Sequence, residues 1–344
     1  MTKVAFFQND IGVGGIQKSL INLLKHLDYS EFDVTLFLFD DSSFWNVEFP
    51  EQLKIRTLKA VDNKYKYLPF DMCFKNSFTF DEGEYFDLAV DFNSYQPSCA
   101  LGAITVPAQR RVMWIHNNVE IKYKNEWKYR VLFRAMKGKF KYFDEFVPCS
   151  NALAEPFKKL SGQYDKKYTV IQNYIDADEI LIKSKECIDF EPDCSKLNFV
   201  ALGKLCHQKG YDIMLDIFEK ASKERDDLHL YILGDGPDRE KLENIAGDNV
   251  TFLGNRTNPY AYMNKCDAFI STSRYEGQPL NIKEAEVIGL PLYCTKNLEA
   301  YSAGLKGQDD LVSAIVSAEK ETKKPDMLEH YNKTILESIK KLAK

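Results

Sequence analysis

Short apolar runs alternate along the chain with longer segments in which apolar residues recur every three to four positions. The longer segments have the period of an amphipathic α-helix, and residues 16–27 are a clear example. The short runs have the length of buried strands, and strands that alternate with helices predict parallel sheets with crossover helices. We therefore expect an α/β fold, with strands in the first half at 4–7, 34–39, 55–58, 86–91 and 111–115.

The same alternation begins again after a polar stretch near the middle of the chain. Strands are predicted there at 197–202, 228–233, 250–254 and 267–271. A chain of 344 residues is long enough for two domains that each bury a core. The expected organisation is an N-terminal domain over 1–175, a linker over 176–196, a C-terminal domain over 197–325 and a terminal helix over 326–344.

Composition narrows the possible classes of protein. Hydrophobic residues at 44% and charged residues at 28% are typical of a soluble globular protein, and a net charge of -5 argues against a general nucleic-acid binder. The N-terminal apolar run is too short for a signal peptide, and no later run could span a bilayer. We expect a cytoplasmic protein, or one on the inner face of the membrane. The eight cysteines are scattered without a Cys-x-x-Cys pair, so we expect reduced thiols and no zinc site.

The densest group of candidate functional residues follows the strand predicted at 267–271. A loop there contains Glu276 and Gly277, and a helix is predicted from Pro279 onward. The first N–H groups of a helix have no partner within it, so they can bind an anion such as a diphosphate beside the carboxylate. Glu284 follows eight positions after Glu276, and its carboxylate can accept two hydrogen bonds from a diol such as a ribose.

This stretch resembles the signature of the retaining, nucleotide-sugar-dependent glycosyltransferases of family 4. Their pattern is Glu, seven residues, Glu, a helix and a Gly-x-Pro-hydrophobic strand, and it reads here as Glu276, Glu284 and residues 289–293. Two glutamates at that spacing alone are most often exposed charges on a helix; the strand, loop, helix and second strand around them make the resemblance specific. Past Thr295 the match weakens, because the family's Gly-Gly loop is replaced by residues 296–300.

The resemblance implies the GT-B fold: two doubly wound, Rossmann-like parallel-sheet domains that face a central cleft. The C-terminal domain would bind the nucleotide-sugar donor, the N-terminal domain the acceptor, and the terminal helix would pack back on the N-terminal domain. The implied reaction moves a hexose from a UDP- or GDP-linked sugar to an acceptor hydroxyl with retention. Bacterial capsule, exopolysaccharide or other cell-surface glycan assembly is the implied setting, with a lipid-linked or glycan acceptor.

The resemblance also implies a donor site that needs neither metal nor cofactor. Lys204 and Lys209 occupy the positions of the family's two diphosphate-binding cations, of which the first is an arginine in the family. Lysine keeps the charge and loses the bidentate fork, so the phosphate should be held less rigidly. Glu284 would hold the ribose. The hexose would be bound by Glu276 and by the backbone of Gly277, Gln278, Pro279 and Leu280.

Two features of the N-terminal half are candidates with competing interpretations. Gly14 and Gly15 match a family loop that lies beneath the donor phosphate. A dinucleotide-binding site is the alternative, because Asp40 and Asp41 follow the strand at 34–39, where such a site has its ribose-binding acid. Against this alternative, Gln17 occupies the position of the third glycine in the dinucleotide-binding pattern.

His116 follows the strand predicted at 111–115, where side chains face the ligand crevice of an open α/β sheet. The family often has a histidine at this point that contacts the transferred sugar, which makes His116 a catalytic candidate together with Glu276. A histidine bonded to loop backbone is the alternative, and the sequence leaves both open.

The segment 108–141 is the most basic part of the chain, with ten Lys or Arg against two Glu, a balance of 10 − 2 = +8. If residues 121–143 form one helix, Arg130, Arg134, Lys137 and Lys141 lie in one stripe beside an aromatic one. Such a stripe could bind a lipid diphosphate or an anionic membrane surface. A solvated basic face is the alternative.

Other functions stay open at this stage. A nucleotide-sugar epimerase of GT-B architecture would need the same donor site and no acceptor. An NAD-dependent dehydrogenase and a catalytically silent binding partner are further alternatives. Asp176-Ala177-Asp178 spells the metal-binding motif of another glycosyltransferase fold, but it starts a polar linker instead of ending an early strand.

Overall fold

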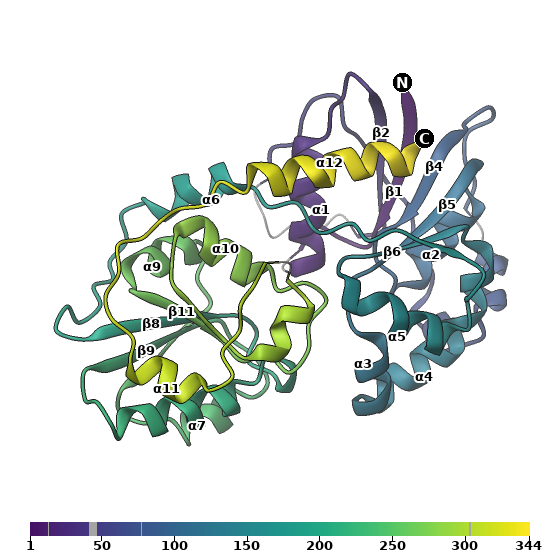
Figure 1. Ribbon diagram of the computed structural model, residues 1–344. Helices are drawn as coiled ribbons and strands as arrows, with labels where there is room; N and C mark the ends of the chain where they lie inside the picture. Colours follow the sequence, from purple (N-terminus) through teal and green to yellow (C-terminus); the bar gives the residue numbers. More distant parts are fainter. Residues whose placement is uncertain (13, 41–46, 77, 303) are drawn as a thin grey trace. The chain divides into compact units, whose positions relative to one another are not determined.

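The computed structural model describes residues 1–12, 14–40, 47–76, 78–302 and 304–344, so Asp41 lies outside the described residues. The chain forms two compact units (Figure 1). Unit 1 consists of residues 1–174 and 330–344, and unit 2 of residues 175–329.

Unit 1 is built on a parallel sheet of seven strands, in the order β3-β2-β1-β4-β5-β6-β7. Its central strands are buried almost throughout, which explains why their sequences are continuous apolar runs. The strands are β1 (Thr2–Gln8), β2 (Phe32–Leu38), β3 (Lys54–Thr57), β4 (Phe86–Asp91), β5 (Ala108–Ile115), β6 (Glu145–Pro148) and β7 (Lys167–Tyr168).

Helices cover both faces of this sheet (Figure 1). On one face, α1 and the terminal helix α12 pack on apolar side chains of β1, β2, β4 and β5. On the other, α2 contacts β1, β4 and β5. The α-helices are α1 (Gly15–His26), α2 (Pro97–Thr105), α3 (Val119–Asn125), α4 (Trp127–Met136), α5 (Asn151–Ser161) and α12 (Glu329–Ala343); the 3₁₀ segments are η1 (Asn63–Tyr67), η2 (Phe70–Asn76) and η3 (Lys137–Tyr142).

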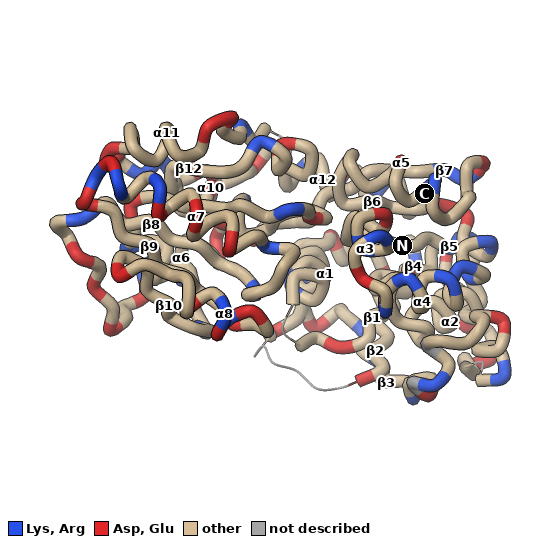
Figure 2. Tube along the Cα trace, turned by 90° about the horizontal axis from the view of Figure 1, so that it is seen from below, with Lys and Arg blue, Asp and Glu red and all other residues tan. Residues whose placement is uncertain are grey.

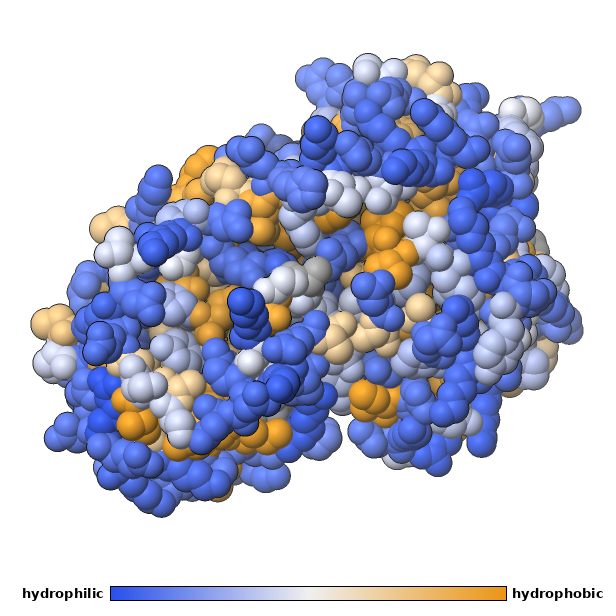
Figure 3. Space-filling model, in the orientation of Figure 1, coloured by the Kyte–Doolittle hydropathy of each residue, from blue (hydrophilic) through white to orange (hydrophobic). Residues whose placement is uncertain are grey.

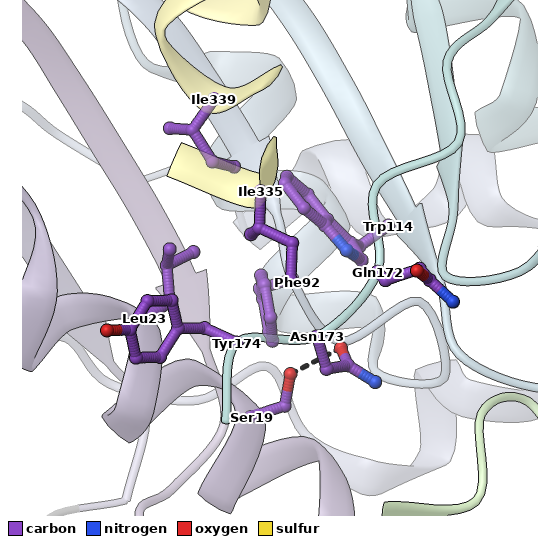
Figure 4. A pocket seen from close by; sticks show the side chains of 9 residues that line it. All are labelled: Ser19, Leu23, Phe92, Trp114, Gln172, Asn173, Tyr174, Ile335 and Ile339. Atoms are coloured by element: carbon purple, nitrogen blue, oxygen red, sulfur yellow. Dashed lines mark hydrogen bonds between the residues drawn. The ribbon is translucent and has the colours of Figure 1, made fainter. Parts of the chain in front are cut away.

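The terminal helix α12 is part of unit 1. Its apolar stripe enters the core there, and Arg110 donates a hydrogen bond of 3.0 Å to Leu342 O in its last turn. Figure 4 shows Ile335 and Ile339 of α12 beside a cavity of about 10 Å³, with a hydrogen bond from Ser19 to Asn173 at its edge. The cavity is about the size of one water molecule, so it is a packing gap and not a sugar site.

Unit 2 contains a parallel sheet of five strands, in the order β10-β9-β8-β11-β12. The strands are β8 (Leu197–Leu202), β9 (Leu228–Leu233), β10 (Val250–Gly254), β11 (Ala268–Ser271) and β12 (Leu292–Cys294). The α-helices are α6 (Ala177–Ser184), α7 (Tyr211–Ser222), α8 (Arg239–Glu243), α9 (Pro259–Lys265), α10 (Leu280–Ile288) and α11 (Leu311–Val316); the 3₁₀ segments are η4 (His207–Lys209) and η5 (Lys296–Ala300).

The strand order of unit 2 reverses between β8 and β11. The chain runs outward from β8 to β10, then crosses back and adds β11 and β12 on the other side of β8. In open α/β sheets, ligands bind outside the carboxyl ends of the strands at such a reversal. The loops that follow β8 and β11 therefore occupy the ligand-binding edge of unit 2.

The stretch 176–196, expected as a linker, begins with a helix. Asp176 caps α6 by accepting a hydrogen bond of 3.0 Å from the backbone N–H of Glu179. The helix contacts α9 and α10, so this part of the chain folds with unit 2.

On the face drawn in Figure 3, hydrophobic areas are small and separated by hydrophilic ones. Within the described ranges, no helix has both the length and the apolar composition needed to cross a bilayer.

Candidate active site

Two loops meet at the ligand-binding edge of unit 2. The β8 loop (203–210) and the β11 loop (272–279) follow neighbouring parallel strands. Thr272 Oγ1 donates a hydrogen bond of 2.8 Å to Gly210 O, and the backbone N–H of Arg274 donates one of 2.8 Å to Gln208 O. The two loops thus form one surface.

Gly210 is essential for this close contact. Its φ of +66° lies in the left-handed region, and a Cβ placed on it would lie 2.2 Å from Thr272 O. Any side chain here would push the two loops apart. A glycine directly after Lys209 is therefore a packing requirement of the two loops.

Lys209 and Glu276, both predicted as donor ligands, bind each other across the loops. The distance from Lys209 Nζ to Glu276 Oε1 is 2.6 Å, and Gln208 Nε2 donates to Glu276 Oε2 at 3.3 Å. Glu276 is 5% exposed. A short, charge-assisted contact of this kind gives the two side chains defined positions at the edge of the sheet.

Helix α10 begins directly beside this pair. Pro279 is its N-cap residue, and no side chain in the described part of the chain caps its first turn. Asn281 Nδ2 donates a hydrogen bond of 2.7 Å to Leu202 O, which fixes the start of the helix at the end of β8. Gly277 and Gln278 are buried just before it. The N-terminal dipole and N–H groups of α10 are therefore near Lys209 and Glu276, as an anion site requires.

Glu284 lies in the second turn of α10 and is 5% exposed. The hydroxyl of Tyr260, at the start of α9, donates a hydrogen bond of 3.1 Å to Glu284 Oε1. This contact orients the carboxylate that was assigned to a ribose. Tyr260 was not predicted as a site residue, because the Asn-Pro-Tyr sequence there indicates only the start of a helix.

Two further parts of the predicted donor site are Lys204 and the segment after Thr295. Lys204 is exposed on the β8 loop. Where the sequence departs from the family after Thr295, Asn297 Nδ2 donates a hydrogen bond of 2.9 Å to Ser273 O. That segment therefore supports the β11 loop from behind.

Gly14, Gly15 and His116 lie in unit 1 at the carboxyl ends of β1 and β5. Gly14 is the N-cap residue of α1, with extended backbone, and a Cβ on it would lie 2.4 Å from the Gln17 side-chain oxygen. His116 Nε2 lies 2.9 Å from Phe92 O, and because a carbonyl only accepts, the ring donates. Burial lowers the pKa of His116 to about 4, so the imidazole is neutral near pH 7.

A buried ion pair under the same edge of unit 1 was not predicted. Lys139 Nζ lies 3.8 Å from Asp91 Oδ2 and donates a hydrogen bond of 2.6 Å to Ser94 O. Asp91 ends β4, and both charged side chains are almost completely buried. Burial raises the pKa of Asp91 to about 6 and lowers that of Lys139. Lys139 was one of the ten basic residues counted over 108–141, and the structure shows that it anchors the loop after β4.

The single basic helix expected over 121–143 is wrong. The segment consists of α3, α4 and η3, with an extended residue, Glu126, between the two helices. Arg130 donates from Nε to Tyr123 O at 3.0 Å and from Nη2 to Lys124 O at 2.9 Å. These bonds satisfy carbonyls that the end of α3 leaves unpaired, so Arg130 stabilises the break.

The other members of the predicted stripe have varied surroundings. Arg134 Nε donates to the Tyr123 hydroxyl at 2.8 Å, and Lys141 Nζ lies 3.4 Å from Asp71. Lys137 is exposed at the start of η3. Figure 2 shows acidic residues among the basic ones around α3 and α4. The charge excess is real, but much of it is used within the fold.

In the ranges that the structure describes, no three His, Cys, Asp or Glu side chains gather as metal ligands would. Asp176, in the Asp-x-Asp sequence, serves as the cap of α6.

Family models match both halves of the chain. The model described as Glycosyltransferase Family 4 matches residues 13–179, and the model described as Glycosyl transferases group 1 matches residues 196–322. The second match contains the β8 and β11 loops and both glutamates of the pattern.

Several curated relatives are named as glycosyltransferases. An uncharacterized glycosyltransferase of Methanocaldococcus jannaschii is 24% identical over 54% of this chain, and the match covers 47% of that protein. The N-acetylgalactosamine-N,N'-diacetylbacillosaminyl-diphospho-undecaprenol 4-alpha-N-acetylgalactosaminyltransferase of Campylobacter jejuni is 25% identical over 86% of this chain and 81% of its own length. The chain thus spans about half of one of these relatives and about four fifths of the other.

Solved structures show the same architecture. HepE of Anabaena, in complex with UDP and glucose, superimposes with a TM-score of 0.67 over 99% of both chains at 17% identity. A TarM variant of S. aureus, in complex with fondaparinux, alpha-GlcNAc-glycerol and UDP, gives a TM-score of 0.64 over 100% of this chain and 97% of that one at 11% identity. The likeness establishes the fold that the sequence predicted.

Proposed function

Because the chain belongs to the group 1, family 4 glycosyltransferases and has their GT-B fold, we propose that it transfers a hexose from a nucleoside-diphosphate sugar to an acceptor hydroxyl. The proposed donor is UDP- or GDP-linked, and the anomeric configuration is retained. The proposed setting is the assembly of a bacterial capsule, exopolysaccharide or other cell-surface glycan. The named activities of the relatives support this class of reaction.

One observation carries the proposal. The contact between Lys209 and Glu276 lies beside the start of α10, at the strand reversal of unit 2. A cation, a carboxylate and a helix N-terminus at such an edge can hold a diphosphate and the sugar attached to it.

Each side chain then has a distinct role. Lys209 exchanges Glu276 for the donor diphosphate, and with Lys204 and the first turn of α10 it stabilises the charge on the leaving nucleotide. Glu276, once released, accepts hydrogen bonds from hexose hydroxyls, with the backbone of Gly277 to Leu280 beside it. Glu284, oriented by Tyr260, holds the ribose. His116 is proposed to contact the transferred sugar, as a neutral ring whose Nδ1 can accept a hydrogen bond from a hydroxyl.

These cations make a metal unnecessary in the proposed mechanism. Activity should survive EDTA at full rate, since Lys204, Lys209 and the α10 N-terminus supply the positive charge. Loss of activity that Mn²⁺ restores would contradict this part of the proposal.

The proposed acceptor is a lipid-linked or glycan hydroxyl, and the proposed location is the cytoplasm with peripheral contact to the membrane. The corner between α3 and α4 supports membrane contact. Trp127 is 68% exposed at the start of α4, Val131 is 44% exposed one turn later, and Lys128 Nζ lies 5.8 Å from the Trp127 ring. An exposed tryptophan among lysines suits an anionic interface, because the ring enters the headgroup layer and the cations bind phosphate.

Thermal shift against UDP-, GDP-, ADP- and CDP-sugars, with NAD as a control, tests the proposal. A ligand at about 100 times its Kd adds about 2.7 kcal/mol of stability, so one nucleotide sugar should raise Tm clearly. A response to NAD alone would contradict the proposal and favour the dinucleotide site. Product analysis with donor alone then excludes the epimerase, which would release an altered nucleotide sugar without any acceptor.

A further inference from the structure

Arg274 makes a set of contacts that the proposed reaction does not use. Its Nη1 donates hydrogen bonds to His207 O at 2.9 Å and to Asp212 Oδ1 at 2.8 Å, and its Nη2 donates to Asp212 Oδ2 at 2.6 Å. Its backbone N–H binds Gln208 O. One residue of the β11 loop therefore holds three residues in and after the β8 loop.

The geometry is that of a rigid clamp. A guanidinium that meets both oxygens of one carboxylate is fixed in direction as well as in distance. Asp212 lies in the first turn of α7, so it is itself held by a helix. The clamp thus fixes the β11 loop to the framework of α7.

The clamp spans the two residues that are proposed to act on the donor. Lys209 lies between His207 and Asp212 in the sequence, and Glu276 lies two residues after Arg274. Any movement of one loop against the other would change the distance between Lys209 Nζ and Glu276 Oε1, now 2.6 Å.

We propose that Arg274 and Asp212 are positioning residues of the donor site, which set the separation of Lys209 and Glu276 without touching the donor themselves. The inference rests on the proposed function, because it needs a diphosphate between the two loops. Misplacement of a binding group by about 1 Å can cost about 100-fold in rate, so a clamp at this point has a measurable effect.

A direct contact of Arg274 with the donor is a competing role, and it predicts the opposite change in donor affinity when Asp212 is neutralised. If its guanidinium left Asp212 to bind the phosphate directly, Asp212 would compete with the donor, and its neutralisation would strengthen donor binding. In the positioning role, neutralisation of Asp212 weakens donor binding.

Unit 2 contains a matched control pair. Arg225 binds both oxygens of Asp227 at 2.7 Å and donates to two backbone carbonyls, Val316 O and Ala318 O. The side-chain exposures, 22% and 44%, are close to the 26% and 41% of the clamp. Asp227 precedes β9, so this pair lies at the amino edge of the sheet, away from the two loops.

Calorimetric titration with UDP or GDP, whichever the unmodified protein binds, tests the inference. Asp212→Asn and Arg274→Lys should each weaken binding about 10-fold, since each loses the two-pronged contact. Asp227→Asn should leave the affinity unchanged. Unchanged or tighter binding in Asp212→Asn would overturn the inference.

A double-mutant cycle separates positioning from general destabilisation. In a Lys209→Ala background, Asp212→Asn should cause little further loss, because the clamp acts through Lys209. In a Tyr260→Phe background, which affects only the ribose end, the full 10-fold loss should remain. Equal losses in both backgrounds would show a merely structural role. If the unmodified protein bound neither UDP nor GDP, the proposed function itself would fail, which is a different result.

Discussion

The β8 and β11 loops of unit 2 and the segment of unit 1 that contains α3, α4 and η3, residues 119–142, both contain charged residues, but these residues have different roles. In unit 2, Lys209 and Glu276 come from separate loops and meet at 2.6 Å beside a helix N-terminus. In unit 1, Arg130 binds the carbonyls that end α3, and Lys139 is buried against Asp91. Charged side chains in loops that follow neighbouring strands come together as a candidate site. Many of the charged side chains that are close together in the segment 119–142 instead make contacts that stabilise the fold.

Among variants that test whether the charged residues of unit 2 form a donor site, Glu284→Ala should cause the largest loss of donor affinity. A carboxylate that accepts two ribose hydrogen bonds, each worth about 1.5 to 3 kcal/mol, supports at least about 100-fold in donor affinity. Calorimetry with the nucleotide identified by thermal shift measures the loss. Tyr260→Phe is the matched control, with a loss of only a few fold, because it removes an orienting contact and keeps the carboxylate. Wild-type affinity in Glu284→Ala would remove the ribose role.

The next effect is expected at the lysines. Lys209→Ala should lower kcat/KM about 30-fold, since one hydrogen bond between charged groups is lost. Lys209→Arg should keep most of the activity. Lys204 is exposed, so Lys204→Ala should cost less, about 10-fold or below. Equal losses at the two positions would show that the contact with Glu276 does not distinguish Lys209.

Much of this fold was predictable, and the limits of prediction have a physical cause. Buried parallel strands are apolar runs, so their places follow from the residues themselves. The pairing of Arg274 with Asp212 joins residues 62 positions apart, and no local pattern indicates it. The break in the basic helix depends on Glu126 being extended and on the support of Arg130, which are tertiary choices.

Some residues of the candidate sites could likewise be predicted from the sequence, and others could not. Glu276, Gly277 and Glu284 could be found because their spacing along one strand, loop and helix fixes their relative positions. Lys139 could not be separated from its exposed neighbours, because its partner Asp91 lies on a distant strand. Composition counts both kinds of lysine equally.

A smaller effect is expected at the membrane contact that we propose for unit 1. Lys128→Glu with Lys137→Glu should weaken co-sedimentation with anionic vesicles about 10-fold or more, at about 1 kcal/mol for each basic residue near the surface. The same reversal at Lys220 and Lys241, which are exposed in unit 2, is the matched control and should have little effect. Equal binding of the first variant and the parent would leave only the solvated-face interpretation.

The smallest effect concerns the pH dependence of stability. Because the pKa of Asp91 is raised to about 6 from 3.8, the folded state binds more protons than the unfolded state between these values. The free energy of unfolding should therefore fall as pH rises from 4 to 6, and Asp91→Asn should flatten this slope. All three tryptophans belong to the sequence of unit 1, so urea unfolding followed by their fluorescence reports that unit.

The matched control for this slope is Asp212. Its pKa is lowered from 3.8 to about 2, chiefly by the side-chain hydrogen bonds from Arg274, so above about pH 5 it is ionised in both the folded and the unfolded state. Asp212→Asn should therefore leave the slope between pH 5 and 6 as it is. If the free energy of unfolding of Asp91→Asn still fell with the same slope, other titratable groups would be its cause.

The most direct test of the donor site is a crystal structure with the bound nucleoside diphosphate. We predict that the β-phosphate contacts Lys209 Nζ and the first turn of α10, that Glu276 has released Lys209, and that the ribose hydroxyls bind Glu284. A nucleotide whose ribose instead binds Asp40 in unit 1, with no contact to Glu284 or Lys209, would contradict the proposed donor site.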